Sequence, residues 1–475
     1  MAAMGETPAQ TGEEKPDWLP DGCGLLADGT YDAIVMGTGL KEATISGLLS
    51  TRGMKVLHVD RNGYYGGDCA SLNLTNLYEK FRPGEQPAPS LGHPTRDYNV
   101  DLIPKFIMAC GNLVKMLLLT KVTRYLEFKN IDGSYVYKAG KTLKVPATPD
   151  EALRTSLMGM FEKRRFRKLL VYLSGYDKDK PETYGGLDLR AMTMRQVYEH
   201  FGVDENTMSF TGHAMALQRD DSYLNAPAMQ TVEAIQLYCY SLERYGKSPY
   251  IYPMYGLGGL PEGFSRLCAI HGGTFMLQCP VEEVLFNDKG KAWGIKANLD
   301  GETQIARAKI VIGDPSYFPK EKVRSTGRVV RSICILDHPL PNTANSESSQ
   351  IIIPGLQVGR QHDIYVCMVS FSHCVAGEGK YIAIASTTVE TSNPISELAP
   401  AFQVIGPILE RFDAVSETFA PTADGSVDSC YISESYDATS HFETTSQDIL
   451  SLYERITGEK LDLTINADST EADEC

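Results

Sequence analysis

Two glycines and two acids near the start of the chain have the types and spacing of a nucleotide site. Gly37 and Gly39 follow a short apolar run, Glu42 comes three residues later, and Asp60 follows the next apolar run. A glycine turn between a strand and a helix binds the pyrophosphate of a dinucleotide, and an acid after the second strand binds its ribose. The pattern therefore predicts a phosphate-type turn.

This turn departs from the dinucleotide fingerprint at one position. Glu42 stands where G-x-G-x-x-G has a small residue, which lets the helix pack closely on the strand. A carboxylate in the first turn of a helix stabilises the helix but repels a phosphate. We therefore expect a vestigial turn and no bound cofactor, although Gly37, Gly39 and Asp60 are retained. A chance Gly-x-Gly is disfavoured because strand, turn, helix and acid all have the expected spacing.

The elements that must position these residues are a strand over residues 34–36, a helix over residues 43–50 and a strand over residues 56–59. Apolar side chains recur on one face of the helix. Two parallel strands joined through a helix open a dinucleotide-binding fold. The expected fold class is therefore α/β: a flavoprotein-like domain of the FAD/NAD(P)-binding type, with more than one sheet and an inserted α-helical domain.

Changes in hydrophobic pattern divide the chain into domains. Helical spacing dominates residues 150–245, and residues 103–119 are apolar nearly all round, which predicts a helix buried on every side or lining an apolar cavity. Strand-like runs return after residue 246. We predict a sheet domain (31–94, 131–149 and 246–460), a helical domain (95–130 and 150–245), a disordered extension (1–30) and a polar C-terminal tail (461–475).

Composition excludes several classes of function. The 475 residues carry a net charge of −15, which disfavours nucleic-acid binding. Eleven cysteines without a CxxC pair, and no basic and apolar leader, predict reduced thiols in a cytoplasmic protein without a metal site. The cationic run over residues 163–168 (KRRFRK) favours a solvated, salt-bridged helix face over a nuclear signal.

A flavin-dependent oxidoreductase is the main alternative on this scaffold. Enzymes of the amine-oxidase and phytoene-desaturase type share the two-domain plan, and they close the flavin site with a C-terminal Gly-Asp segment that opens a helix. The last forty residues here are polar, and we expect no apolar strand, Gly-Asp turn and helix among them. No Cys, His or carboxylate cluster predicts catalytic residues either, so we expect no enzyme.

Longer motifs resemble one family over residues 31–455. In order they are DRNGYYGGDCAS (60–71), NVDLIPKF (99–106), FEKRRFRK (161–168), FTGHAMAL (210–217), RYGKSPY (244–250), DIYVCM (363–368), KYIAIASTTVET (380–391) and SYDATSHFETT (435–445). Together they resemble the Rab GDP-dissociation inhibitor family. The related Rab escort proteins share several of these motifs but are longer, with a large insertion in the sheet domain, so the length favours the inhibitor branch.

The resemblance implies a non-enzymatic protein that binds GDP-bound, geranylgeranylated Rab GTPases. Such a protein slows GDP release, extracts Rabs from membranes and recycles them in vesicular traffic. It implies a cytoplasmic monomer that contacts membranes transiently. The implied Rab-binding platform falls on Tyr65, Arg244, Gly259, Arg266, Thr274 and Met276. Gly259 replaces the family's glutamate, whose loss removes a charge-assisted contact of roughly 1.5–3 kcal/mol unless the nearby Glu262 replaces it.

The resemblance also implies a prenyl pocket between helices of the inserted domain. A twenty-carbon prenyl chain gains on the order of 0.8 kcal/mol per buried CH₂ in lipid or in protein, so an apolar pocket offsets the hold of the membrane. We selected candidate lining residues by apolar helical spacing rather than by a family motif, and each also fits a plain core position. They are Val114, Leu117, Leu118, Met160 and Phe161.

Overall fold

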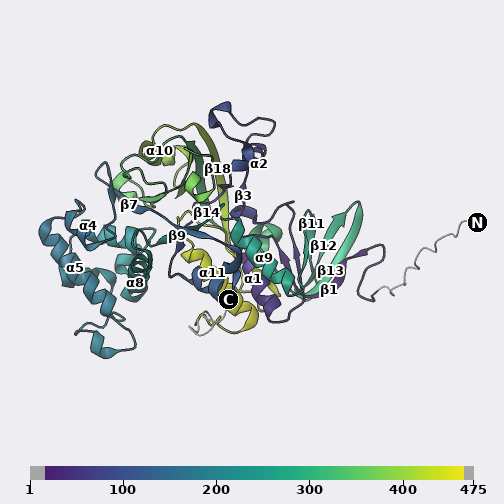
Figure 1. Ribbon diagram of the computed structural model, residues 1–475. Coiled ribbons are helices and arrows are strands. Elements are labelled where there is room, and N and C mark those ends of the chain that lie inside the picture. Colours follow the sequence, from purple (N-terminus) through teal and green to yellow (C-terminus); the bar gives the residue numbers. More distant parts are fainter. Residues whose placement is uncertain (1–15, 465–475) are drawn as a thin grey trace, which may run out of the picture.

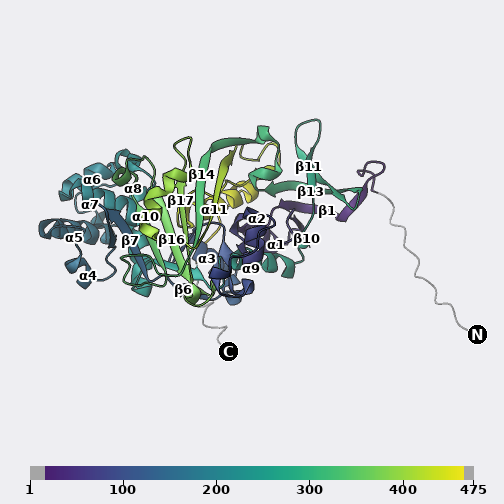
Figure 2. The ribbon, with the colours of Figure 1, turned by 90° about the horizontal axis from the view of Figure 1, so that it is seen from above.

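The computed structural model describes residues 16–464 and shows an elongated molecule (Figure 1). Helices α4 (Pro149–Arg154), α5 (Met160–Gly175) and α8 (Ala228–Tyr245) lie at one end and the strands of the first sheet at the other. A second sheet lies between them (Figure 2). No helix within residues 16–464 is both long and apolar enough to cross a membrane.

The predicted strand, helix and strand unit forms the centre of the first sheet. It consists of β1 (Gly24–Met36), α1 (Leu40–Thr51) and β2 (Val56–Val59), with the two strands parallel. The strand order is β10-β2-β1-β13-β12-β11, and β19 pairs with the end of β13. The remaining strands are β10 (Thr274–Met276), β11 (Val281–Phe286), β12 (Ala292–Leu299), β13 (Glu302–Gly313) and β19 (Cys430–Ile432).

Helix α1 is buried almost throughout because two later helices pack against it. These are α9 (Gly259–Ile270) and α11 (Glu443–Thr457). Gly47 of α1 makes the first contact possible, since a Cβ there would lie 3.3 Å from the carbonyl oxygen of Phe264 and 3.1 Å from Cδ2 of Leu267. The helix therefore belongs to the core and not to the surface of the sheet.

The C-terminal expectation is wrong in one part, because helix α11 lies within the last forty residues and the short strand β19 comes just before them. Strand β19 pairs in parallel with residues 311–313 of β13, and α11 follows and packs on α1. The strand has three residues, and the helix presents only Ile449, Leu452 and Tyr453 as buried apolar side chains, so neither produced a clear pattern. The connecting residues begin with Ser433 and Glu434 and contain no Gly-Asp pair.

The second sheet is antiparallel except for one strand pair, β7 with β15, and helix α10 (Ala399–Ile405) packs on it. Its strand order is β18-β14-β17-β16-β15-β7-β8. The strands are β7 (Gly133–Lys138), β8 (Lys141–Lys144), β14 (Val323–Leu336), β15 (Ser349–Ile353), β16 (Ile364–Ser370), β17 (Tyr381–Thr388) and β18 (Glu410–Pro421).

The helices of the helical layer have recognisable capping residues at their ends. Thr148 caps α4 (Pro149–Arg154), Thr193 and Gln196 form a capping box on α6 (Met194–Phe201), and Gly246 ends α8 (Ala228–Tyr245) at a φ of +76°. The other helices are α5 (Met160–Gly175) and α7 (Glu205–Phe210). Helices α5, α6 and α8 pack on one another.

Residues 95–130 pack mainly on strands and on α11 and reach the helical layer only through contacts of β5 and Cys110 with α8, which departs from the domain prediction. Strand β5 (Ile107–Met108) pairs with β9 (Tyr250–Pro253), which also pairs with β6 (Phe128–Asn130). Only α3 (Asn112–Leu119) is helical as predicted, and it packs on α11. A run that is apolar all round suits a buried strand as well as a buried helix, and here long-range strand pairing decided.

The predicted disordered extension is also wrong where the structure describes it. Strand β1 begins at Gly24, which aligns with Gln304 of β13, and Leu26 is fully buried. The Trp18 ring packs edge-on against Trp293, with 6.3 Å between ring centroids. Pairing with a distant strand therefore orders this segment. Residues 1–15 of the predicted extension and residues 465–475 of the predicted tail lie outside the described residues.

Candidate functional site

The glycine turn lies at the carboxyl end of β1, as predicted. Gly37 has a φ of +92°, and a Cβ there would lie 2.8 Å from Oδ2 of Asp314. The backbone N–H and the hydroxyl of Thr38 each donate to Oδ2 of Asp60 at 2.6 Å, and the backbone N–H of Asn62 donates to Oδ1 at 2.7 Å. Asp60, which a ribose would require, therefore bonds the turn itself.

Glu42 closes the turn from inside the protein. Its buried carboxylate accepts the Ser433 hydroxyl at 2.6 Å, and a Cβ on Gly39 would lie 2.6 Å from its other oxygen. In a dinucleotide fold the pyrophosphate approaches the backbone at this glycine. The carboxylate of Glu42 thus occupies the place of the phosphate.

The electrostatics of the turn also disfavour a phosphate. Burial and the neighbouring charge of Asp314 raise the pKa of Glu42 to about 7. The adjacent Lys41 turns away and donates to Asp448 at 2.9 Å. Burial lowers the pKa of His58, beneath the turn, to about 4, so this ring is neutral. These residues do not fit a pyrophosphate, and we refer to Gly37, Gly39, Glu42 and Asp60 as the closed turn.

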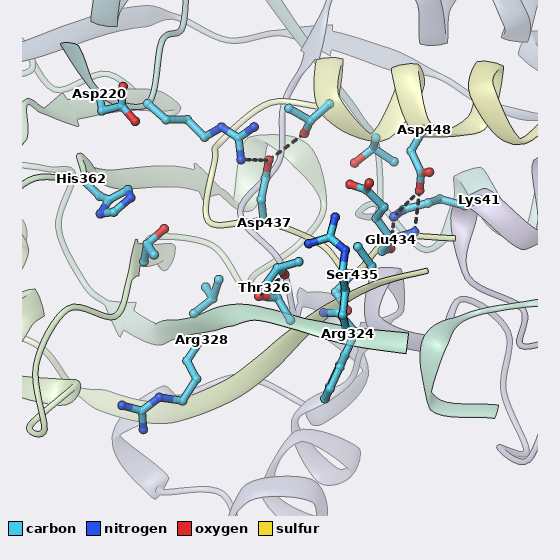
Figure 3. A pocket seen from close by; sticks show the side chains of 18 residues that line it. Lys41, Asp220, Arg324, Thr326, Arg328, His362, Glu434, Ser435, Asp437 and Asp448 are labelled. Atoms are coloured by element: carbon cyan, nitrogen blue, oxygen red, sulfur yellow. Dashed lines mark hydrogen bonds and ion pairs between the residues drawn. The ribbon is translucent and has the colours of Figure 1, made fainter. Parts of the chain in front are cut away.

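Two cavities flank the closed turn. One, of about 380 Å³, lies directly over it, and its lining includes Asp68 and Asp314 besides residues of the turn. The other, of about 370 Å³, lies on the far side of Lys41, and Figure 3 shows this lysine pointing at Asp448 and Glu434. Charged groups of both signs line the second cavity, and several of them form ion pairs or hydrogen bonds with one another. Neither cavity presents a uniformly cationic wall to a dinucleotide.

The expected platform residues come together at the other side of β2. Strand β10 is the edge of the first sheet and pairs in parallel with β2. Its Phe275 packs on His58, with 4.9 Å between ring centroids, and on Tyr65 at 6.0 Å. Thr274 and Met276 point to the opposite face of the sheet, because side chains alternate along a strand. All three remain partly exposed along the edge.

Helix α9 supplies the charged part of the same surface. Arg266 is exposed, and its guanidinium lies 4.4 Å from the centroid of the Tyr125 ring. Burial raises the pKa of Tyr65, and the negative charge of Glu262 raises it further, which places this exposed carboxylate beside the tyrosine. We refer to Tyr65, Glu262, Arg266 and Phe275 as the exposed edge.

Two of the expected Rab-binding residues, Gly259 and Arg244, are not part of the exposed edge. Gly259 is the first residue of α9, and a Cβ there would meet only the side chain of Leu126, at 3.0 Å, so a larger residue needs a shift of that leucine. Arg244 is exposed in the last turn of α8, where its guanidinium lies 5.9 Å from the Tyr245 ring. Arg244 therefore lies on a different element from the exposed edge.

The five candidate pocket residues lie in two separate places. Val114, Leu117 and Leu118 belong to α3, which packs on α11. Leu117 is buried, and the other two are partly exposed. Met160 and Phe161 begin α5, which packs on α6 and α8, and they are 79% and 75% exposed. The two helices do not bring these residues together in this conformation, because apolar spacing does not distinguish a core helix from an exposed one, and their role in a prenyl pocket stays a prediction.

Two aromatic residues that order the exposed edge, Phe275 within it and Tyr125 beneath Arg266, were missed from the sequence. Phe275 lies between two residues that were identified, and the alternation of strand side chains places it on the other face, toward Tyr65. Tyr125 lies far from Arg266 in the sequence and stacks under it only because the 3₁₀ turn Val122–Tyr125 packs on α9. Of these two residues, only Phe275 could have been identified from the local sequence.

Known proteins show the same fold over most of the chain. A Rab GDI from Plasmodium falciparum is 48% identical and superposes with a TM-score of 0.87, covering 91% of this chain and 99% of that one. An oxidoreductase from Methanosarcina mazei is 16% identical, with a TM-score of 0.56, covering 89% of this chain and all of the other. The scaffold is therefore the α/β FAD/NAD(P)-binding-like fold that the sequence predicted.

Sequence comparisons are more specific. A probable secretory pathway GDP dissociation inhibitor 1 from Schizosaccharomyces pombe is 55% identical over 91% of this chain and 97% of its own length. Rab GDP dissociation inhibitor beta from Rattus norvegicus is 54% identical over 91% of this chain and 96% of its own. The model of the family described as GDI, GDP dissociation inhibitor, matches residues 27–468. The chain therefore belongs to the GDP dissociation inhibitor family.

Proposed function

We propose that this protein binds GDP-bound, geranylgeranylated Rab GTPases, slows their release of GDP, extracts them from membranes and returns them during vesicular traffic. It acts without catalysis, as a cytoplasmic monomer in transient contact with membranes. The observation that carries this proposal is identity above 50% to named GDP dissociation inhibitors over nearly the whole chain. The exposed edge supports it as a rigid binding surface.

The exposed edge has the composition of a protein interface. Tyr and Arg are the residue types that contribute most at such interfaces, and Tyr65 and Arg266 are held in place by ring contacts with Phe275 and Tyr125. Because these side chains are ordered in the free protein, binding costs little conformational entropy. Arg244, Gly259, Thr274 and Met276 extend the proposed Rab-binding surface.

The prenyl group is proposed to bind at the helical layer. Met160 and Phe161 are exposed there, so covering them with an apolar chain removes surface from water at about 25 cal/mol per Å². Val114, Leu117 and Leu118 are proposed as lining only in a conformation that opens α3. The strongly exposed apolar side chains at the start of α5 therefore make this helix the preferred site.

The oxidoreductase alternative receives no support from the closed turn. Glu42 occupies the phosphate position, and Asp60 already accepts four hydrogen bonds from the protein. A Rab escort protein remains the related alternative, and a test of Rab geranylgeranylation distinguishes it. Failure to support prenylation of unmodified Rab, with inhibition of GDP release intact, favours the inhibitor.

The decisive experiment measures release of fluorescent GDP from prenylated and unprenylated Rab. The wild-type protein should slow release strongly from prenylated Rab and weakly from unprenylated Rab. Arg266→Glu should weaken both effects, whereas the control Arg307→Glu, on an exposed strand position of β13, should not. Phe161→Ser should weaken binding of prenylated Rab only, with the exposed Val427→Ser as its control. Unchanged release with wild-type protein would overturn the proposal.

A further inference from the structure

The outer face of α5 carries three cations that nothing in the described protein neutralises. Arg164, Arg167 and Lys168 are exposed, and none of them makes an ion pair or hydrogen bond with another residue of 16–464. Their neighbours differ: Lys163 donates to the Leu153 carbonyl at 2.7 Å, and Arg165 pairs with Glu162 at 3.3 Å. The predicted salt-bridged face therefore holds for only part of the run, and we refer to the three free cations as the cationic face.

Apolar side chains share this face. Residues 160, 164, 167 and 171 follow one another at helical spacing, so Met160 and Val171 flank the cations on one stripe of α5. The buried side of the helix is formed instead by residues such as Leu169 and Leu173. The strongly exposed apolar side chains of α4 and α5 are Leu153 (74%), Met160 (79%), Phe161 (75%) and Val171 (66%).

The position of this surface matters because the rest of the protein is acidic. The chain carries a net charge of −15, and α4 and α5 lie at one extreme end of the molecule (Figures 1 and 2). An anionic surface therefore repels most of the protein but attracts this end. The charge distribution therefore orients the protein so that its helical layer faces the anionic surface.

We propose that the cationic face docks the protein on anionic phospholipid bilayers, with the apolar side chains around it entering the interface. Cations beside exposed apolar side chains match a lipid surface, which offers anionic headgroups over an apolar phase. Nucleic acid or an acidic peptide satisfies the cations but leaves the aliphatic side chains in water. Docking there brings α5 to the bilayer in which a prenyl chain resides.

The use of docking for prenyl transfer rests on the proposed function, but docking itself does not. Flotation of the full-length protein with vesicles, in the absence of any Rab, measures it directly. Binding should be strong to phosphatidylcholine vesicles containing phosphatidylserine, weak to phosphatidylcholine alone, and lost as salt screens the charges. The triple variant R164Q/R167Q/K168Q should partition about a hundredfold less, since each cation contributes about a fivefold factor near an anionic surface.

The matched control removes three exposed lysines that lie outside the helical layer and have no ion pair within the described chain: Lys289, Lys291 and Lys320. Substituting these three by Gln should leave vesicle binding within about twofold of wild type. Both triple variants should slow GDP release from prenylated Rab in solution as the wild type does. That assay shows that they fold and tests the proposed function separately.

Three outcomes would overturn the docking proposal. The first is equal binding of wild-type protein to vesicles with and without phosphatidylserine. The second is equal loss of binding in the α5 variant and the control. The third is binding to duplex DNA as tight as to anionic vesicles at the same salt, which would indicate a general polyanion surface. With the proposal correct, the α5 variant also extracts prenylated Rab more slowly from anionic vesicles but not from neutral ones.

Discussion

The closed turn and the exposed edge both adjoin β2, but they satisfy their polar groups in opposite ways. At the closed turn, Glu42 and Asp60 bond to Ser433 and Thr38 of the same chain. At the exposed edge, Glu262 and Arg266 remain at the surface, and the Arg266 guanidinium lies over the Tyr125 ring. A scaffold built around a nucleotide can thus lose its ligand by internal bonding and gain a protein-binding surface one strand away.

The largest effect is expected from a substitution that releases the C-terminal segment, which supplies Ser433 to the closed turn. The buried Lys105 donates to Oδ1 of Asp437 at 2.7 Å and to the carbonyl oxygens of Thr439 and His441 at 2.9 and 3.1 Å. Lys105→Met should lower the free energy of unfolding by about 3–5 kcal/mol, because a buried carboxylate and two carbonyls lose their partner. Chemical denaturation measures this change.

Lys309→Met is the control for that experiment. Lys309 pairs with Asp32 at 2.7 Å, but its side chain is largely exposed, so its removal should cost less than about 1 kcal/mol. Equal losses in the two lysine variants would show that the C-terminal segment is not fastened through Lys105. The exposed edge should keep its affinity for Rab in both variants wherever they are folded.

The second prediction uses pH. Because burial and the charge of Asp314 raise the pKa of Glu42 from its ordinary value of 4.5 to about 7, the folded state holds this proton more tightly than the unfolded chain. The resulting stability is complete below about pH 4.5 and is lost as pH rises through 7, on the order of 3 kcal/mol. Glu42→Gln should lack this loss. Its unfolding free energy relative to wild type should therefore rise between pH 5 and pH 8, and a constant difference would contradict the assignment.

The third prediction concerns the exposed edge alone. Tyr65→Ala should weaken inhibition of GDP release about 30-fold, roughly 2 kcal/mol, because it removes an ordered aromatic side chain from the interface. Its unfolding free energy should change little, since the ring is partly exposed. Tyr240→Ala, an exposed tyrosine on α8, serves as the control. Loss of stability without loss of affinity would make Tyr65 a structural residue.

The smallest expected effect tests whether another residue replaces the family glutamate that is absent at Gly259. Glu262 is close enough to Tyr65 for its negative charge to raise the pKa of that tyrosine, and we predict that it supplies the carboxylate that Gly259 lacks. Glu262→Gln should weaken Rab binding about tenfold, roughly 1.4 kcal/mol, through loss of a charge-assisted hydrogen bond. Gly259→Glu should then restore affinity in the Glu262→Gln background. If Gly259→Glu raises affinity in the wild-type background as much as in the Glu262→Gln background, Glu262 does not replace the family residue.

The sequence predicted those parts of the fold in which the contacting residues lie close together along the chain. The unit from β1 to β2 and the closed turn lie within about forty residues, and turn, helix and acid were all identified. Strand β5 was not, because Ile107 and Met108 pair with residues 251 and 250, and β19 was not, because it pairs with β13. Apolar spacing also gave the same signal for the buried Leu117 and the exposed Phe161.

The pairing of β19 with β13 has a consequence for synthesis of the protein. The N-terminal strand and helix leave the ribosome first, yet β1 pairs with β13, and α1 is covered by α9 and α11. Glu42 receives its partner only when Ser433 has been made. The apolar surface of the nascent first domain therefore stays open until nearly the whole chain is translated, which makes folding slow and dependent on protection from aggregation.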